Sequence, residues 1–221
     1  MQNQNQNINQ NLNLNHHQLS PTSQGSTVAL LIVDLQNDFL HPRGAYARGG
    51  AVSEKARALP AKVEGVAKHI KENAGLVVAS PFTLWPGIGG EPLISDHLKK
   101  LRPFLKEGDF QPMSWGQQNV DALKDLIDFS VSKVAYSAFF NTQLDWVLAR
   151  AGIKELVVCG IVTNGGVASS VRDAHMRDYR CTVLSDGCAA FSDQIHETAL
   201  ADLRTVATVT TCDAYLSGVR I

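Results

Sequence analysis

The sequence predicts an α/β fold: a doubly wound, six-stranded parallel sheet flanked by helices. Short, continuous apolar runs rich in β-branched residues alternate along the chain with segments of helical periodicity. Such unbroken apolar runs are typical of strands buried on both faces of a parallel sheet. Because right-handed crossovers place all strand carboxyl ends on one edge, a ligand-binding crevice is expected at that edge.

Six strands and four main helices account for this pattern. The expected strands are Val28–Val33, Leu76–Ala79, Phe129–Val134, Glu155–Cys159, Cys181–Leu184 and Val206–Thr210. Apolar residues from Val52 to Ile70 recur at alternating steps of four and three, which indicates an amphipathic helix. Pro60 inside this run is expected to kink the helix or to mark its true start. The other helices are expected over residues 144–151, ending at Gly152, after Val171, and over residues 194–204.

Composition limits the class of protein. With 221 residues and 44% hydrophobic residues, the chain is sized for one globular domain, which we place at residues 27–221. Residues 1–26 are rich in Asn and Gln and are expected to form a disordered tail without a secretory or mitochondrial signal. The net charge of −1 and the lack of a long apolar run argue against nucleic-acid and membrane partners. Four cysteines without metal-ligand spacing favour a reduced, cytoplasmic protein.

Two charged residues and one turn follow expected strands. Asp34 ends the first strand, Lys133 lies near the end of the third, and residues 160–166 follow the fourth. By itself, Asp34 fits a helix cap as well as an acid, and most lysines are simply solvated. If both face one crevice, however, the lysine charge and the burial of the aspartate oppose each other in setting its pKa. Such a balance is how general acids and bases are tuned.

Three motifs together resemble the isochorismatase-like hydrolase superfamily, over Thr27 to about Leu216. They are Leu31–Phe39, Lys133 with Tyr136–Phe139, and Gly160–Asn164. The resemblance implies a Rossmann-like, three-layer sandwich that acts on a small-molecule substrate. It also implies assembly as a homo-oligomer, a dimer or a tetramer.

The resemblance also implies the catalytic positions. Cysteine-hydrolase members cleave amide or nitrile C–N bonds through a thioester with an Asp–Lys–Cys triad, and Asp34 and Lys133 match its first two residues. The cysteine position is Gly166, so covalent thiol chemistry is not expected there. Nicotinamidases carry an Asp-x-His metal site after the second strand, where this chain has Ser80–Thr83. We therefore expect no metal and no cofactor.

Some isochorismatases likewise have glycine at the cysteine position. They cleave a vinyl ether, which requires an acid and a water but no nucleophilic side chain, and Asp34 held by Lys133 fits the acid. Those enzymes have Tyr-Ala-His where this chain has Val162–Asn164, a pattern of the amidase-like members. The favoured expectation is vinyl ether hydrolysis. The alternatives are a C–N hydrolase that uses activated water and a non-catalytic small-molecule binder.

The remaining candidates concern binding. Family members carry a non-proline cis peptide that matches Ile161–Val162, which would aim the amides of Val162 and Gly166 into the crevice as an oxyanion cradle. Cys188 is either a displaced nucleophile or, as we favour, a buried thiol, and His175 and His196 are expected to serve packing. Further pocket residues are expected to be Thr163, Asn164, Gly165, Phe39, Phe82, Trp85, Tyr136 and Phe139, although the aromatics, like Trp115, would also fit core packing. The Gly/Pro-rich segment of residues 84–119 is expected to be functional or to form a lid.

Overall fold

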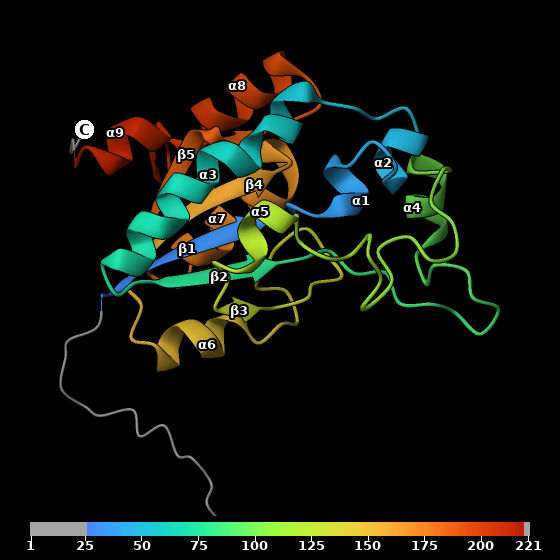
Figure 1. The fold of residues 1–221 in the computed structure, drawn as a ribbon, viewed down its shortest axis with the longest axis horizontal. Coiled ribbons are helices and arrows are strands. Elements are labelled where there is room, and N and C mark those ends of the chain that lie inside the picture. The colour runs from blue at the N-terminus through green and yellow to red at the C-terminus, as the bar shows by residue number, and fades with distance from the viewer. Residues whose placement is uncertain (1–25, 219–221) are drawn as a thin grey trace, which may run out of the picture.

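The computed structural model describes residues 26–218 and contains a six-stranded sheet between two layers of helices (Figure 1). The strand order is β3-β2-β1-β4-β5-β6, and every neighbouring pair is parallel. The strands are β1 Val28–Val33, β2 Leu76–Ser80, β3 Phe129–Ser130, β4 Glu155–Ile161, β5 Arg180–Ala189 and β6 Thr208–Thr210. The chain builds outward from β1 to β3 and then crosses to β4. The point where the strand order reverses therefore lies between β1 and β4, where open α/β sheets bind ligands.

Alternate residues of the central strand serve two separate cores. Ala29, Leu31 and Val33 face one side, where α6 (Leu144–Arg150), α7 (Ala168–His175) and α8 (Asp193–Leu203) contribute apolar side chains. Leu30 and Ile32 face the other side, where α3 (Glu54–Glu72), α5 (Asp121–Lys124) and α9 (Cys212–Leu216) pack. This two-sided burial explains why β1 is apolar at every position.

The helices differ in detail from the sequence expectations. α3 begins at Glu54, after Ser53, whose hydroxyl accepts from the Ala56 amide at 3.2 Å. Pro60 lies six residues inside the helix, so the expectation that it marks the true start is wrong. Within the described part of the chain, no helix has the length and apolar character needed to cross a membrane.

The third and fifth strands also differ. A strand was expected at residues 129–134, but β3 is only two residues long. Beyond Ser130 the chain forms one isolated bridge, in which Lys133 pairs with Phe82 in the segment after β2. β5 is longer than expected and contains a bulge, since Val158 pairs with Val183 and Gly160 with Cys188.

Three short helices lie beyond the carboxyl ends of the strands. α1 (Asn37–Leu40) and α2 (Ala45–Arg48) follow β1, and α4 (Asp96–Leu101) lies within the 84–119 segment. Figure 1 shows these helices together with that segment, beyond the carboxyl ends of the strands. The expectation for the N-terminal tail concerns residues 1–26, which lie, apart from Ser26, outside the described residues.

Candidate active site

Asp34 lies at the switch point of the sheet. It directly follows β1, is 5% exposed and has a φ of +57°, a conformation that aspartate tolerates better than most residues. Gly160 on β4 approaches so closely that a Cβ there would lie 2.0 Å from the Val33 carbonyl oxygen. Glycine is therefore required at position 160, where its φ is +123°.

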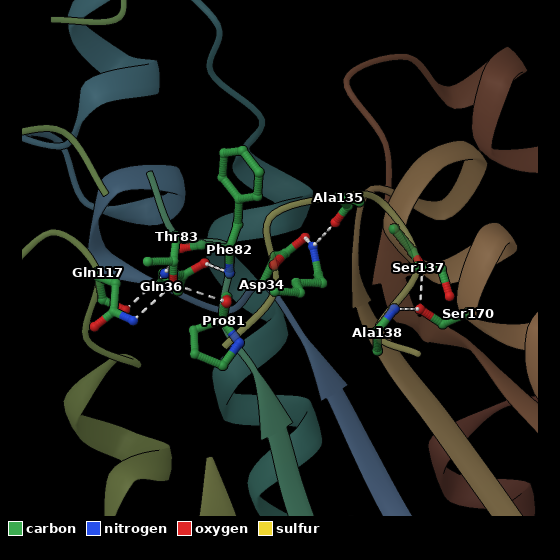
Figure 2. Close-up of polar contacts among 12 residues, drawn as sticks. Asp34, Gln36, Pro81, Phe82, Thr83, Gln117, Ala135, Ser137, Ala138 and Ser170 are labelled. Carbon is green, nitrogen blue, oxygen red and sulfur yellow. Dashed lines mark hydrogen bonds and ion pairs between the residues drawn. The ribbon is translucent and has the colours of Figure 1, made fainter. Parts of the chain in front are cut away.

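Lys133 forms a buried ion pair with Asp34. The lysine Nζ lies 2.7 Å from Asp34 Oδ2 and also donates to the Ala135 carbonyl at 3.1 Å (Figure 2). Lys133 is 1% exposed, and its Nζ lies 5.3 Å from the centre of the Phe82 ring. The other carboxyl oxygen, Asp34 Oδ1, is buried and has no hydrogen-bond partner among the described residues. The oxygen that Lys133 holds, Oδ2, is also the one that faces Gly166, since a Cβ at Gly166 would lie 3.0 Å from it.

Burial has a strong effect on this carboxyl group. Desolvation raises the pKa of Asp34, whereas the charge and hydrogen bond of Lys133 and the backbone of Phe82 act to lower it; the net result is a pKa of about 6, above the ordinary 3.8. A carboxyl group with this pKa is present in both protonation states near neutral pH. It can therefore serve as an acid or as a base.

The turn after β4 completes the site. The Ile161–Val162 peptide bond is cis, and Thr163–Val167 forms one turn of π-helix before α7. A Cβ at Gly166 would lie 2.9 Å from Val33 Cγ1 and 3.0 Å from Asp34 Oδ2. The carboxyl group of Asp34 thus lies directly beside the place where a side chain of residue 166 would begin.

Ser170 fixes the backbone of this turn. Its hydroxyl donates to the Gly166 carbonyl at 2.7 Å and accepts from the Ala138 amide at 2.9 Å. Figure 2 shows the second contact, which joins α7 to the segment that follows Lys133. One buried hydroxyl therefore connects the glycine turn to the lysine-bearing segment.

A cavity of about 340 Å³ opens above Asp34. Seven of its lining residues are among those expected from the sequence: Asp34, Phe39, Tyr136, Val162, Asn164, Gly165 and Gly166. Five others were not identified from the sequence: Tyr46, Arg102, Ser169, Phe191 and Ile195. The cavity combines an apolar wall with a carboxyl group, a guanidinium group, an amide and several hydroxyl groups.

The structure places the other expected pocket residues elsewhere. Lys133 and Phe82 do not line the cavity, because the lysine pairs with Asp34 and the Phe82 ring packs against Phe110, with ring centres 5.4 Å apart. Thr163 is fully buried, and its Oγ1 lies 2.7 Å from His196 Nδ1 on α8. Its side chain therefore supports the turn from behind.

Trp85 and Phe139, which were also expected to line the pocket, lie away from this cavity. Trp85 is 55% exposed on the 84–119 segment, where its carbonyl accepts from the Leu93 amide and closes a local turn. Phe139 is buried in the core beneath α7, with the Arg177 guanidinium 4.8 Å from its ring centre. Both follow a strand end in the sequence, but local hydrogen bonds and core packing turn them away from the cavity.

The four cysteines do not line the cavity. All four are buried and unbridged, and the Cys188 thiol points toward the Val158 carbonyl oxygen at 3.8 Å. Burial raises the pKa of Cys188 far above its usual range. A thiol in this state is a poor nucleophile. His175, at the end of α7, is exposed.

The residues missed by sequence analysis come from segments far from Asp34 in the chain. Tyr46 and Phe191 stack with their ring centres 5.5 Å apart, and Arg102 Nε lies 3.4 Å from the Tyr46 hydroxyl. Nothing in the sequence distinguishes Arg102 from its basic neighbours, because its position depends on the path of the whole 84–119 segment. The only available signal was the unusual length of that segment.

Residues 80–83, at the end of β2 and directly after it, do not suit a metal ion. Ser80 and Thr83 offer hydroxyl groups, and Pro81 and Phe82 offer no side-chain ligand. Within residues 26–218, no three His, Cys, Asp or Glu side chains are grouped as metal ligands.

The chain belongs to the isochorismatase family, since residues 28–214 match the model of the isochorismatase domain. It is 32% identical over 192 residues to the ureidoacrylate amidohydrolase RutB of Caulobacter vibrioides, covering 81% of this chain and 84% of that protein. An isochorismatase-like hydrolase from Alkaliphilus metalliredigens has a similar fold, with a TM-score of 0.72 and 23% identity over 90% of this chain and all of that one. The nicotinamidase PncA from Bacillus subtilis gives a TM-score of 0.69 with 23% identity, covering 83% and 98% of the two chains. The protein is thus an isochorismatase-family hydrolase.

Proposed function

We propose that this hydrolase acts on a small carboxylate-bearing metabolite through Asp34 acid–base chemistry, without a covalent thiol intermediate. The favoured reaction is hydrolysis of a vinyl ether of the isochorismate type. The observation that carries this proposal is the arrangement at Gly166. Where a nucleophilic side chain would begin, the nearest functional group is the Asp34 carboxyl, 3.0 Å away.

Asp34 in its protonated form supplies the acid. It gives its proton to the terminal methylene carbon of the vinyl ether, and the ether oxygen stabilises the resulting oxocarbenium ion. Water adds to this ion and gives up a proton that restores the protonated Asp34 carboxyl, and the neutral hemiketal then collapses to pyruvate and the free alcohol. Lys133, 2.7 Å away, stabilises the carboxylate that remains after proton transfer.

Arg102 is suited to the carboxylate of such a substrate. It lines the cavity, and among the described residues it forms no ion pair. A guanidinium group binds a carboxylate through two parallel hydrogen bonds. Phe39, Tyr136 and Phe191 provide an apolar wall for the rest of the molecule. In addition, the backbone amides of Val162 and Gly166 would serve as oxyanion donors.

The second candidate is hydrolysis of a C–N bond by water that ionised Asp34 activates. The similarity to ureidoacrylate amidohydrolase over 81% of the chain favours this candidate. The two reactions need opposite forms of the same group. Vinyl ether hydrolysis requires protonated Asp34 and slows as pH rises through about 6, whereas base catalysis slows as pH falls through it.

Cellular setting and assembly complete the proposal. Four buried, unbridged cysteines support a reducing, cytoplasmic setting. Large side chains such as Phe140 and Trp146 are more than half exposed, which supports assembly as a dimer or tetramer. Light scattering coupled to size exclusion tests the assembly, and a monomeric mass would contradict it.

Turnover of defined compounds tests the function. Isochorismate, ureidoacrylate and simple amides are incubated with the protein in D2O. Vinyl ether hydrolysis predicts pyruvate with one deuterium in its methyl group, and Asp34→Asn should abolish the reaction while the surface variant Asp121→Asn keeps it. Release of ammonia from an amide would favour the second candidate. No turnover, together with stabilisation by one of these compounds, would support the non-catalytic binder instead.

A further inference from the structure

The three residues that follow Leu35 are buried polar side chains that the proposed reaction does not use. Gln36, Asn37 and Asp38 each bond to a different part of the 84–119 segment or its ends. Asn37 Nδ2 donates to the Trp115 carbonyl at 2.8 Å. Gln36 is the most deeply buried of the three, at 0% exposure.

The Gln36 side chain uses both ends of its amide group. Its Oε1 accepts from the Phe82 amide at 2.8 Å, and its Nε2 donates to the Phe82 carbonyl at 2.9 Å. The same Nε2 donates to the Gln117 carbonyl at 2.7 Å. Figure 2 shows these contacts beside Asp34. Gln36 therefore holds both backbone polar groups of Phe82 and connects them to the far end of the long segment.

Phe82 in turn lies close to the buried ion pair. The residues on either side of Phe82 bond to the backbone of Lys133. The Lys133 amide donates to the Pro81 carbonyl at 2.9 Å, and the Thr83 amide donates to the Lys133 carbonyl at 2.8 Å. The Phe82 ring lies 5.3 Å from Lys133 Nζ, and the Phe82 backbone is one of the groups that lower the pKa of Asp34. Any movement of Phe82 thus changes the surroundings of both charges.

We propose that Gln36 is a positioning residue that fixes Phe82 against the Asp34–Lys133 pair and ties that pair to the segment carrying Arg102. This inference rests on the proposed function, because it assigns a role toward the same acid. Only a primary amide can accept from one backbone group and donate to two others at this site. A side chain of equal size without polar atoms would leave three partly buried backbone groups without these hydrogen bonds, which favours displacement of Phe82.

Gln36→Met tests this role, with Asn37→Leu as the matched control. Both changes remove a buried amide from the same short motif, but only Gln36 contacts Phe82. The Asp34 carboxyl is titrated by carbon-13 NMR in each variant, and kcat is measured alongside. For Gln36→Met we expect the Asp34 midpoint to move above about 6 and kcat to fall about tenfold or more. For Asn37→Leu we expect an unchanged midpoint.

An unchanged or lower Asp34 midpoint in Gln36→Met would overturn the inference, as would equal shifts in both variants. If Gln36→Met does not fold, Gln36→Asn replaces it, because the shorter amide cannot reach Phe82 and Gln117 together; an upward shift again supports the role. The NMR readout needs no substrate. A failure of the proposed function, seen as full activity in Asp34→Asn, therefore remains distinct from a failure of this inference.

Discussion

Removing Lys133, the partner of Asp34, should make the free energy of unfolding fall more steeply as pH rises. In the folded protein the pKa of Asp34 is about 6, above its ordinary value of 3.8, so folding favours the protonated carboxyl. The free energy of unfolding therefore falls as pH rises from about 4 to about 6. The difference between these pKa values corresponds to about 3 kcal/mol at pH above 6.

Lys133→Met removes the positive charge that lowers the pKa of Asp34 and so limits the loss of stability at high pH. Without it, the pKa of Asp34 rises further, and stability continues to fall with pH beyond 6. At pH 5 the carboxyl is mainly protonated in both proteins, so the variant should differ little from the wild type. At pH 8 the variant loses about 1.4 kcal/mol more for each unit by which the pKa of Asp34 rises, up to the roughly 3–5 kcal/mol typical of a broken buried pair.

Urea unfolding at pH 5 and pH 8 measures both differences. Lys68→Met is the control, because Lys68 pairs with Glu64 at 2.6 Å on the surface of α3. The control should lose about 1 kcal/mol or less at both pH values. If Lys133→Met is destabilised equally at pH 5 and pH 8, the proposed electrostatic coupling to Asp34 is wrong.

Three further outcomes follow from the cavity and its supports. Arg102→Met should raise KM about tenfold or more for carboxylate substrates while changing kcat little, and an unchanged KM in steady-state assays would remove the carboxylate-binding role. Gly166→Ala should lower the free energy of unfolding by about 1–3 kcal/mol in urea titrations, because the new Cβ meets Val33 at 2.9 Å and Asp34 at 3.0 Å; a stability equal to the wild type would show that the site has room to relax. Asp38→Asn should lower the melting temperature measured by calorimetry, since its buried carboxylate accepts two backbone amides, and no change would contradict that support.

The sequence was sufficient for the fold because the strands carry a direct signal. Val28–Val33 is apolar at every position, and the structure buries both of its faces, as such a run predicts. The third strand was overestimated because Val131 and Val134 favour strands, although this edge of the sheet keeps only two paired residues. Strand propensity is a property of single residues, whereas strand pairing also depends on the neighbouring strand with which those residues could form hydrogen bonds.

The candidate site was only partly predictable for a similar reason. Asp34 and Gly166 follow strands, and parallel topology alone brings strand ends together. Arg102 and Phe191 reach the cavity through long connections whose course depends on many tertiary contacts. The hydrogen bonds of Gln36 to Phe82 and Gln117 span 46 and 81 residues of sequence, so no local pattern reveals them.

The pH dependence of kcat/KM with isochorismate tests the central claim most directly. The account assigns protonated Asp34 as the acid, with a pKa of about 6 in the free enzyme. The predicted profile is flat at low pH and falls tenfold per pH unit above about 6, and the activity is lost in Asp34→Asn. A profile that rises through pH 6, or one that is unchanged in Asp34→Asn, would contradict the assignment.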